Sequence, residues 1–208
     1  MKALLLKDVY TLKFNIIILG FMLALFAVMN PGIEIAINYG LLMVSIMAIN
    51  SFSHDEKSKW NNYSIALPYG DNKLVLSKYA LALALIVAGS IAHFVISLIS
   101  LTIRGIDINL ELRYIEVAIV VIFSIIATTI SIPIFTKTSN EKGISILAIM
   151  MSIIAVAFSA FAEKFGNEII EFLSGKYFIP ITIFALAILF VISFNISMYL
   201  FKQRNKIS

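Results

Sequence analysis

The run YALALALIVAGSIAHFVISLISLTI, residues 79–103, holds 25 consecutive residues without an aspartate, glutamate, lysine or arginine. A helix needs about 20 mostly apolar residues to cross the hydrocarbon core of a bilayer, so this run predicts a membrane-spanning helix. The composition agrees: 61% of the 208 residues are hydrophobic and 13% are charged, against roughly half and a quarter in a soluble domain. The sequence therefore predicts an all-α integral membrane protein.

Further apolar runs of spanning length lie on both sides of this one. The six predicted spans cover approximately residues 14–30, 33–52, 79–103, 115–135, 144–162 and 177–201. Asn30-Pro31-Gly32 is a turn signal, so the first two spans are expected to form an antiparallel hairpin. No stretch is left for a soluble domain, and residues 1–208 are expected to form a single transmembrane domain.

Two short amphipathic segments are predicted at the membrane surfaces. Apolar and polar side chains separate onto two faces at the N-terminus, with Leu5, Val9 and Leu12 opposite Lys7, Asp8 and Thr11. This pattern favours an interfacial helix that turns into the first span. Residues 163–178, which precede the last span, favour a short helical element at the outer surface.

The basic residues predict the orientation. Twelve of the 16 lysines and arginines fall on the side that carries both termini and residues 53–78, and four fall on the other side. Since basic loops stay in the cytoplasm, both termini are predicted to be cytoplasmic. The net charge of +4 then reflects topology and some attraction to anionic lipid, and no nucleic-acid partner is expected.

The sequence lacks the common motifs of metal-binding, nucleotide-binding and catalytic sites. The chain has no cysteine and only two histidines, so no metal site is expected. It also lacks a Gly-x4-Gly-Lys-Ser/Thr phosphate loop, a Gly-x-Ser-x-Gly elbow and a His-Glu-x-x-His pair. The sequence therefore predicts neither catalytic residues nor a bound cofactor. No pair of buried carboxylates is expected, which weakens the case for a transporter driven by protons or sodium.

Polar residues mark two of the predicted spans. Gly89, His93, Ser97 and Ser100 fall on one side of the third span, and a histidine at this depth is expected to face protein or water. It could make a hydrogen bond inside the bundle, line a substrate path or relay protons. Ser124 and Thr128 give the fourth span a milder polar face, which could line a substrate path or face the bundle interior.

Small residues recur in the fifth span at intervals of three and four. They form a seam of Ser145, Ala148, Ser152, Ala155 and Ser159. Small side chains let helices approach closely in lipid. The seam could therefore pack inside the chain or against a second subunit.

Residues 53–78, SHDEKSKWNNYSIALPYGDNKLVLSK, form the largest predicted cytoplasmic feature. Ser53 and Glu56 have the spacing of a capping box, which predicts a helix from Ser53 to about Ser64 or Ala66. Trp60 and Tyr63 are residue types favoured at protein interfaces and also at lipid headgroups. Both interpretations stay open on the sequence alone.

This loop resembles a signature of bacterial type-2 ABC exporter permeases. The matching residues, in order, are Phe52, Asp55-Glu56, Lys59-Trp60, Tyr63, Leu67-Pro68 and Ser77-Lys78-Tyr79. The opening MKALLLKDVYTLK and the six-span layout also look like that family. The branch is similar to permeases that export amphipathic peptide toxins such as phenol-soluble modulins, or that confer resistance to antimicrobial peptides.

The resemblance implies a division of labour. A separate ATPase subunit would bind ATP and Mg, and this chain, not itself an enzyme, would form half of the path for a peptide, with an identical or different permease subunit as the other half. The loop would be the coupling helix that contacts the ATPase, through Asp55, Glu56, Lys59, Trp60, Tyr63 and Leu67. The location would be the bacterial cytoplasmic membrane. Competing interpretations are a secondary transporter and a membrane scaffold or sensor subunit.

Overall fold

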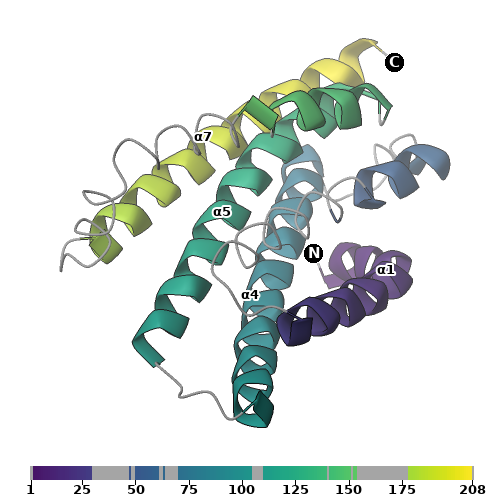
Figure 1. Ribbon diagram of the computed structural model, residues 1–208. Coiled ribbons are helices and arrows are strands. Elements are labelled where there is room, and N and C mark those ends of the chain that lie inside the picture. Colours follow the sequence, from purple (N-terminus) through teal and green to yellow (C-terminus); the bar gives the residue numbers. More distant parts are fainter. Residues whose placement is uncertain are drawn as a thin grey trace.

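A computed structural model describes residues 2–29, 47, 50–60, 63, 70–104, 110–139, 141–150, 152–153 and 178–207. Four long helices dominate this part of the chain (Figure 1): α1 (Lys2–Met29), α4 (Gly70–Arg104), α5 (Leu110–Lys137) and α7 (Phe178–Ile207). Residues 50–57 and 141–150 are also helical, and the described residues include no strand. The all-α prediction is confirmed for these residues.

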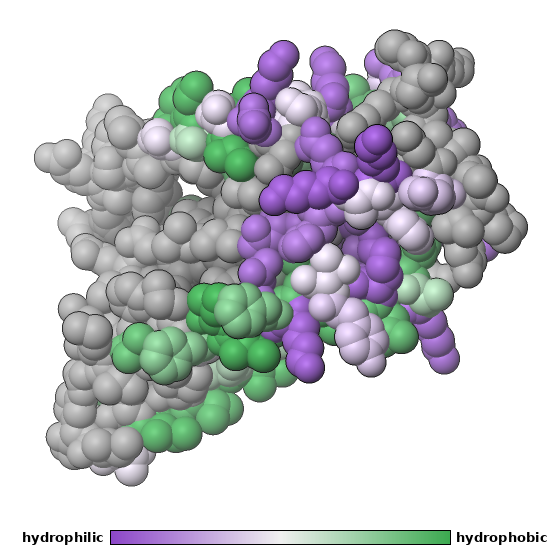
Figure 2. All heavy atoms as spheres, turned by 90° about the vertical axis from the view of Figure 1, so that its right-hand side faces the viewer, coloured by the Kyte–Doolittle hydropathy of each residue, from purple (hydrophilic) through white to green (hydrophobic). Residues whose placement is uncertain are grey.

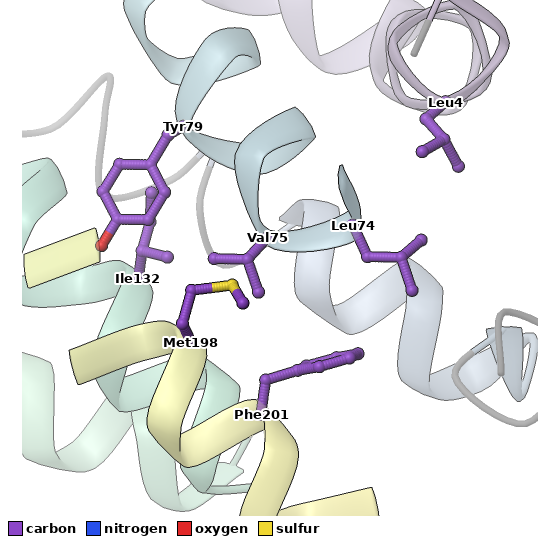
Figure 3. Close-up of a cluster of buried hydrophobic side chains, with 7 residues drawn as sticks. All are labelled: Leu4, Leu74, Val75, Tyr79, Ile132, Met198 and Phe201. Atoms are coloured by element: carbon purple, nitrogen blue, oxygen red, sulfur yellow. The ribbon is translucent and has the colours of Figure 1, made fainter. Parts of the chain in front are cut away.

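Helix α4 is the centre of the arrangement, because it packs against α1, α5 and α7. One apolar core joins the first turns of α1 and α4 to the last turns of α5 and α7. Its members are Leu4, Leu74, Val75, Tyr79, Ile132, Met198 and Phe201 (Figure 3). The starts of two helices and the ends of two others therefore meet at one end of the molecule, which we call the core end.

This core fixes the helix directions. A second core cluster, containing Leu12 and Leu81, lies further along α1 and α4, so these two helices run parallel. Helices α5 and α7 are also parallel, and both run antiparallel to α4 (Figure 1). In the six-span prediction, α1, α4, α5 and α7 correspond to the first, third, fourth and sixth spans. Their observed directions agree with that order.

Two described stretches are long and apolar enough to cross a membrane. They are Asn72–Ala92 in α4 and Pro180–Gln203 in α7, and Val121–Lys137 in α5 is a shorter apolar stretch. The predicted spans 33–52 and 144–162 lie mostly outside the described residues, as do residues 163–177 of the predicted outer element. The six-span topology therefore stays a prediction.

The structure corrects two predicted helix boundaries. Lys2 to Met29 form one unbroken helix, so no turn separates an interfacial helix from the first span; neither glycine nor proline occurs near Lys13 to break it. Residues 50–57 are already helical before Ser53, so the prediction of Ser53 as the N-cap is wrong. That helix is interrupted by a turn at Ser58 and Lys59, earlier than the expected end near Ser64 or Ala66.

Gly143 is held tightly against the end of α5. A Cβ on this residue would lie 2.5 Å from Cε1 and 2.7 Å from Cδ1 of Phe135, whose ring is buried and stacked on Phe52. We expect Gly143→Ala to lower the free energy of unfolding by about 1–3 kcal/mol, because the ring must shift in a filled core. The measurement is thermal unfolding in detergent.

Gly20→Ala is the matched control for this change. Nothing lies within 4 Å of a Cβ at Gly20, and alanine in a helix interior is favoured over glycine by about 0.5–1 kcal/mol. Gly20→Ala should therefore leave the unfolding midpoint unchanged or raise it. Equal midpoints for the two variants would contradict this prediction, because they would show that Phe135 can move away from a Cβ at residue 143 without a measurable cost.

Candidate functional site

The helix at residues 50–57 has an inner and an outer face. Ser51 and Asp55, four residues apart, are buried, and Phe52 beside them is half-buried. The exposed outer positions are His54, Glu56 and Lys57. Figure 2 shows hydrophilic side chains gathered on the side of the molecule that carries this helix, with apolar side chains beside them.

Four charged side chains meet beneath the inner face. We call Lys7, Asp8, Asp55 and Lys78 the charge cluster. Lys7 Nζ lies 3.0 Å from Asp8 Oδ1 and 2.5 Å from Asp55 Oδ1, and Lys78 Nζ lies 3.0 Å from Asp8 Oδ1 and 2.5 Å from Asp55 Oδ2. Each charge therefore contacts two charges of opposite sign, and the cluster is neutral as a whole.

The charge cluster is largely shielded from solvent. The side chains of Asp8, Asp55 and Lys78 are 4%, 9% and 11% exposed, and that of Lys7 is 26% exposed. Lys78 Nζ also donates to Ser51 Oγ at 2.6 Å, so its three N–H groups have three acceptors. Buried charges need this degree of pairing, because each one loses its hydration when it is buried.

Aromatic rings cover both lysines. Lys7 Nζ lies 4.3 Å from the ring centroid of Trp60, and Lys78 Nζ lies 5.4 Å from that of Phe52. Both distances are within the range of cation–π attraction. Phe52 in turn stacks on Phe135 of α5, with centroids 5.7 Å apart. The rings therefore connect the charge cluster to the core end of the bundle.

The turn at Ser58 and Lys59 precedes Trp60 and its contact with Lys7. Ser58 N donates to His54 O at 3.0 Å, and Lys59 N donates to Glu56 O at 3.1 Å, which closes the helix end. Lys59 has a φ of 51°, in the left-handed region that glycine favours and that costs a side-chain-bearing residue energy. The strain lies in the turn that precedes Trp60, whose ring contacts Lys7.

A second cluster of polar residues lies between α4, α5 and α7. Pro133 has no N–H, so it gives no helical hydrogen bond to the carbonyl of Thr129. Ser193 Oγ donates to that carbonyl at 2.7 Å. The Tyr79 hydroxyl lies 2.6 Å from Ser193 Oγ and 2.9 Å from Ser197 Oγ. Tyr79, Ser193, Ser197 and Thr129 form what we call the hydroxyl network, which joins three helices.

An apolar cavity of about 220 Å³ adjoins the charge cluster. It follows α4 from Lys78 to Ala92, with Ile16 of α1 and Thr128 of α5 among its other walls. The N–H groups of Lys78 are already engaged, and Thr128 Oγ1 donates to Ser124 O of its own helix. The described walls therefore offer a ligand apolar surface and no free charge.

The residues predicted to contact an ATPase fall on both faces of the segment. Asp55 is buried and bonded to two lysines of its own chain, and Trp60 is half-buried against the core. Glu56, Lys59 and Tyr63 are exposed, Tyr63 to 67%. Leu67 lies outside the described residues. The coupling role of this set stays a prediction.

The other predicted residues are also divided. Ser124 and Thr128 are buried in the bundle interior, at 3% and 1% exposure, and Thr128 lines the cavity. The side chains of His93, Ser97 and Ser100 lie outside the described part of the structure. In the small seam, Ser145, Ala148 and Ser152 are exposed, while Ala155 and Ser159 lie outside the described residues.

Sequence reasoning missed the partners of Asp55. Lys7 and Asp8 were assigned to a polar outer face of the first helix, but Leu4, Asp8 and Leu12, spaced four apart, form its buried face. The expectation of no paired buried carboxylates is also wrong, since Asp8 and Asp55 share two lysines. The four-residue spacing of Leu4, Asp8 and Leu12 is the sequence feature that could have placed Asp8 on the buried face. No group of three or more potential metal ligands occurs in the part of the chain that the structure covers.

A protein-family model described as "ABC-2 family transporter protein" matches residues 3–202, a range that includes the charge cluster and the hydroxyl network. No curated protein matches the chain, and no solved structure matches it.

Proposed function

The chain belongs to the ABC-2 family of transporter proteins and is a membrane permease of that type; from this premise we propose that it is the permease subunit of an ATP-driven exporter in a bacterial cytoplasmic membrane. It forms half of a translocation path, and a second permease subunit, identical or different, forms the other half. A separate ABC ATPase binds ATP and Mg and supplies the energy. Both chain termini face the cytoplasm with that ATPase.

The observation that carries this proposal is the two-faced segment at residues 50–60. Its inner face is attached to α1, α4 and α5 through the charge cluster and the stacked rings. Its outer face exposes charged residues, and Tyr63, further along the chain, is also exposed. A partner seated on the outer face would act on three helices at once, as a coupling element must. We propose that His54, Glu56, Lys57, Lys59 and Tyr63 contact the ATPase.

Asp55 and Trp60 contribute to coupling from the inner face in this proposal. Asp55 holds the segment to Lys7 and Lys78, and Trp60 covers Lys7. Leu67 is proposed as a further contact of the same loop. The cargo we propose is an amphipathic or hydrophobic peptide. Its support is the resemblance of residues 52–79 to exporters of such peptides.

We propose that the remaining predicted residues serve the path and the subunit interface. His93, Ser97 and Ser100, which the helical repeat places on one side of the third predicted span, are proposed to line the path or the bundle interior. The small seam of Ser145, Ala148, Ser152, Ala155 and Ser159 is proposed to pack against the second permease subunit. Its support is the exposure of Ser145, Ala148 and Ser152.

Tyr63→Ala tests the contact with the ATPase. Truncating a central aromatic residue of an interface costs about 2 kcal/mol or more, so the Kd for the ATPase should rise about 30-fold. The permease is coexpressed with a candidate ABC ATPase from the same genome and purified through a tag on the permease. The retained ATPase is then quantified. The permease alone is expected to hydrolyse no ATP.

Tyr114→Ala is the matched control. Tyr114 is similarly exposed, at 62%, but lies near the start of α5, at the opposite end of the bundle from residues 50–57 (Figure 1). It should retain the ATPase fully. A purified permease that transports its cargo without any ATPase would instead support a secondary transporter. Equal retention by both variants would remove Tyr63 from the interface.

A further inference from the structure

The charge cluster joins three segments that are far apart in the sequence. Lys7 and Asp8 belong to α1, Asp55 belongs to the helix at residues 50–57, and Lys78 belongs to α4. The four contacts form a closed ring in which positive and negative groups alternate. No single segment can therefore leave the ring without separating opposite charges.

Burial decides how firmly this ring holds. An exposed ion pair gains little, because water screens the charges and solvates each of them when they part. In a shielded site the attraction is stronger, and a separated charge loses its partner without regaining water. Three of the four side chains here are at most 11% exposed. The ring should therefore resist small displacements that a surface salt bridge would allow.

The ring also lies between residues 50–57 and the long helix α4, where it can pass a movement from one to the other. Residues 50–57 carry the outer face on one side and Asp55 on the other. Lys78 lies in the third turn of α4, which continues for 26 residues to Arg104. At a rise of 1.5 Å per residue, that part of the helix is about 39 Å long, so a tilt imposed at Lys78 reaches the far end of α4.

We propose that the charge cluster is a rigid joint, which makes residues 50–57, α1 and α4 move as one body when a partner displaces the outer face. Lys7, Asp8 and Lys78 are positioning residues in this joint, and none of them contacts the partner. The inference rests on the proposed function, because it needs an ATPase that moves the segment. It adds which groups transmit the movement and to which helices.

Distances measured between spin labels test the joint without knowledge of the cargo. The native chain has no cysteine, so cysteines placed at Ser58 and Ile91 can be labelled selectively. Both positions are exposed, and Ser58 is not among the residues proposed to contact the ATPase. The labelled permease is diluted with unlabelled chain, assembled with its ATPase and measured by pulsed electron resonance, with and without ATP and vanadate. With the native ring, the distance between the two labels should be narrow and should not change with nucleotide.

Two variants break the joint in different ways. Asp55→Asn removes the one charge that residues 50–57 contribute to the charge cluster. The pair Lys7→Met with Asp55→Asn removes one charge of each sign and keeps the Asp8–Lys78 contact, so it is expected to fold even if the single variant does not. In either variant the distance should become broader and should shift when nucleotide binds. A purely structural role would not create a nucleotide-dependent shift.

The outcomes separate this proposal from the one on which it rests. Failure of the ATPase to copurify with the native labelled chain would contradict the proposed function. If the ATPase copurifies, a nucleotide-dependent distance in the native ring would overturn the joint, because the segment would then move independently of α4. An unchanged, narrow distance in the charge-balanced variant would also overturn it, because other contacts would be holding the segment.

Discussion

Lys78→Met is expected to lower the free energy of unfolding by about 3–5 kcal/mol, the usual cost of removing one partner from a buried ion pair. Methionine keeps much of the apolar stem but removes all three donors. Asp8 and Asp55 would then face each other with only Lys7 to balance them. Ser51 would also lose its donor.

The effect can be measured as the shift in thermal or denaturant unfolding of the detergent-solubilised protein. Trp60 is the only tryptophan in the chain and covers Lys7, so its fluorescence reports on this site directly. Lys73→Met is the control, since Lys73 is exposed one turn earlier in the same helix. If the two variants unfolded alike, the ion pairs would contribute nothing measurable to stability.

Tyr79→Ala is expected to have a similar effect, about 3–5 kcal/mol, for a different reason. Tyr79 is fully buried in the core end, and its ring makes edge contacts with Phe190 and Phe194 of α7, at centroid distances of 4.9 and 5.6 Å. Truncating a large aromatic residue leaves a cavity, and the cost is mostly that of lost packing.

Tyr79→Phe isolates the hydroxyl contribution. It keeps the ring but removes the hydrogen bonds to Ser193 and Ser197, which should cost about 1 kcal/mol. Ser193 retains its bond to the Thr129 carbonyl, so the serine is not left unpaired. The measurement is the same unfolding assay. A phenylalanine variant as unstable as the alanine variant would mean that the hydroxyl network, and not the ring, holds α7 in place.

The residues that carried the family resemblance include several whose role in the structure is internal. Asp55, Lys78 and Tyr79 all stand in the matched motif, and all three are largely shielded inside the core end. Among the described motif residues, others such as Glu56 and Tyr63 are exposed. The described motif residues therefore include both contacts inside the chain and an exposed surface.

The sequence alone predicted an all-α membrane protein, and the described residues are helical where the predicted spans 79–103, 115–135 and 177–201 overlap α4, α5 and α7. A run such as residues 79–103 allows no other solution, because a backbone in lipid must satisfy its hydrogen bonds internally. Composition, apolar length and the resemblance of residues 52–79 also led to the transporter family that the match over residues 3–202 shows. These properties depend on residues that are close together in the sequence.

Only the tertiary structure decided which polar groups meet. Lys7 and Asp55 are separated by 48 positions, and Tyr79 and Ser197 by 118. No local pattern records such pairings, because a charged residue near a span end looks the same whether it faces water or a buried partner. Its environment is set by the helices that pack around it. The energy of a buried charge depends on that environment, so the charge cluster and the hydroxyl network emerged only when the helices were placed together.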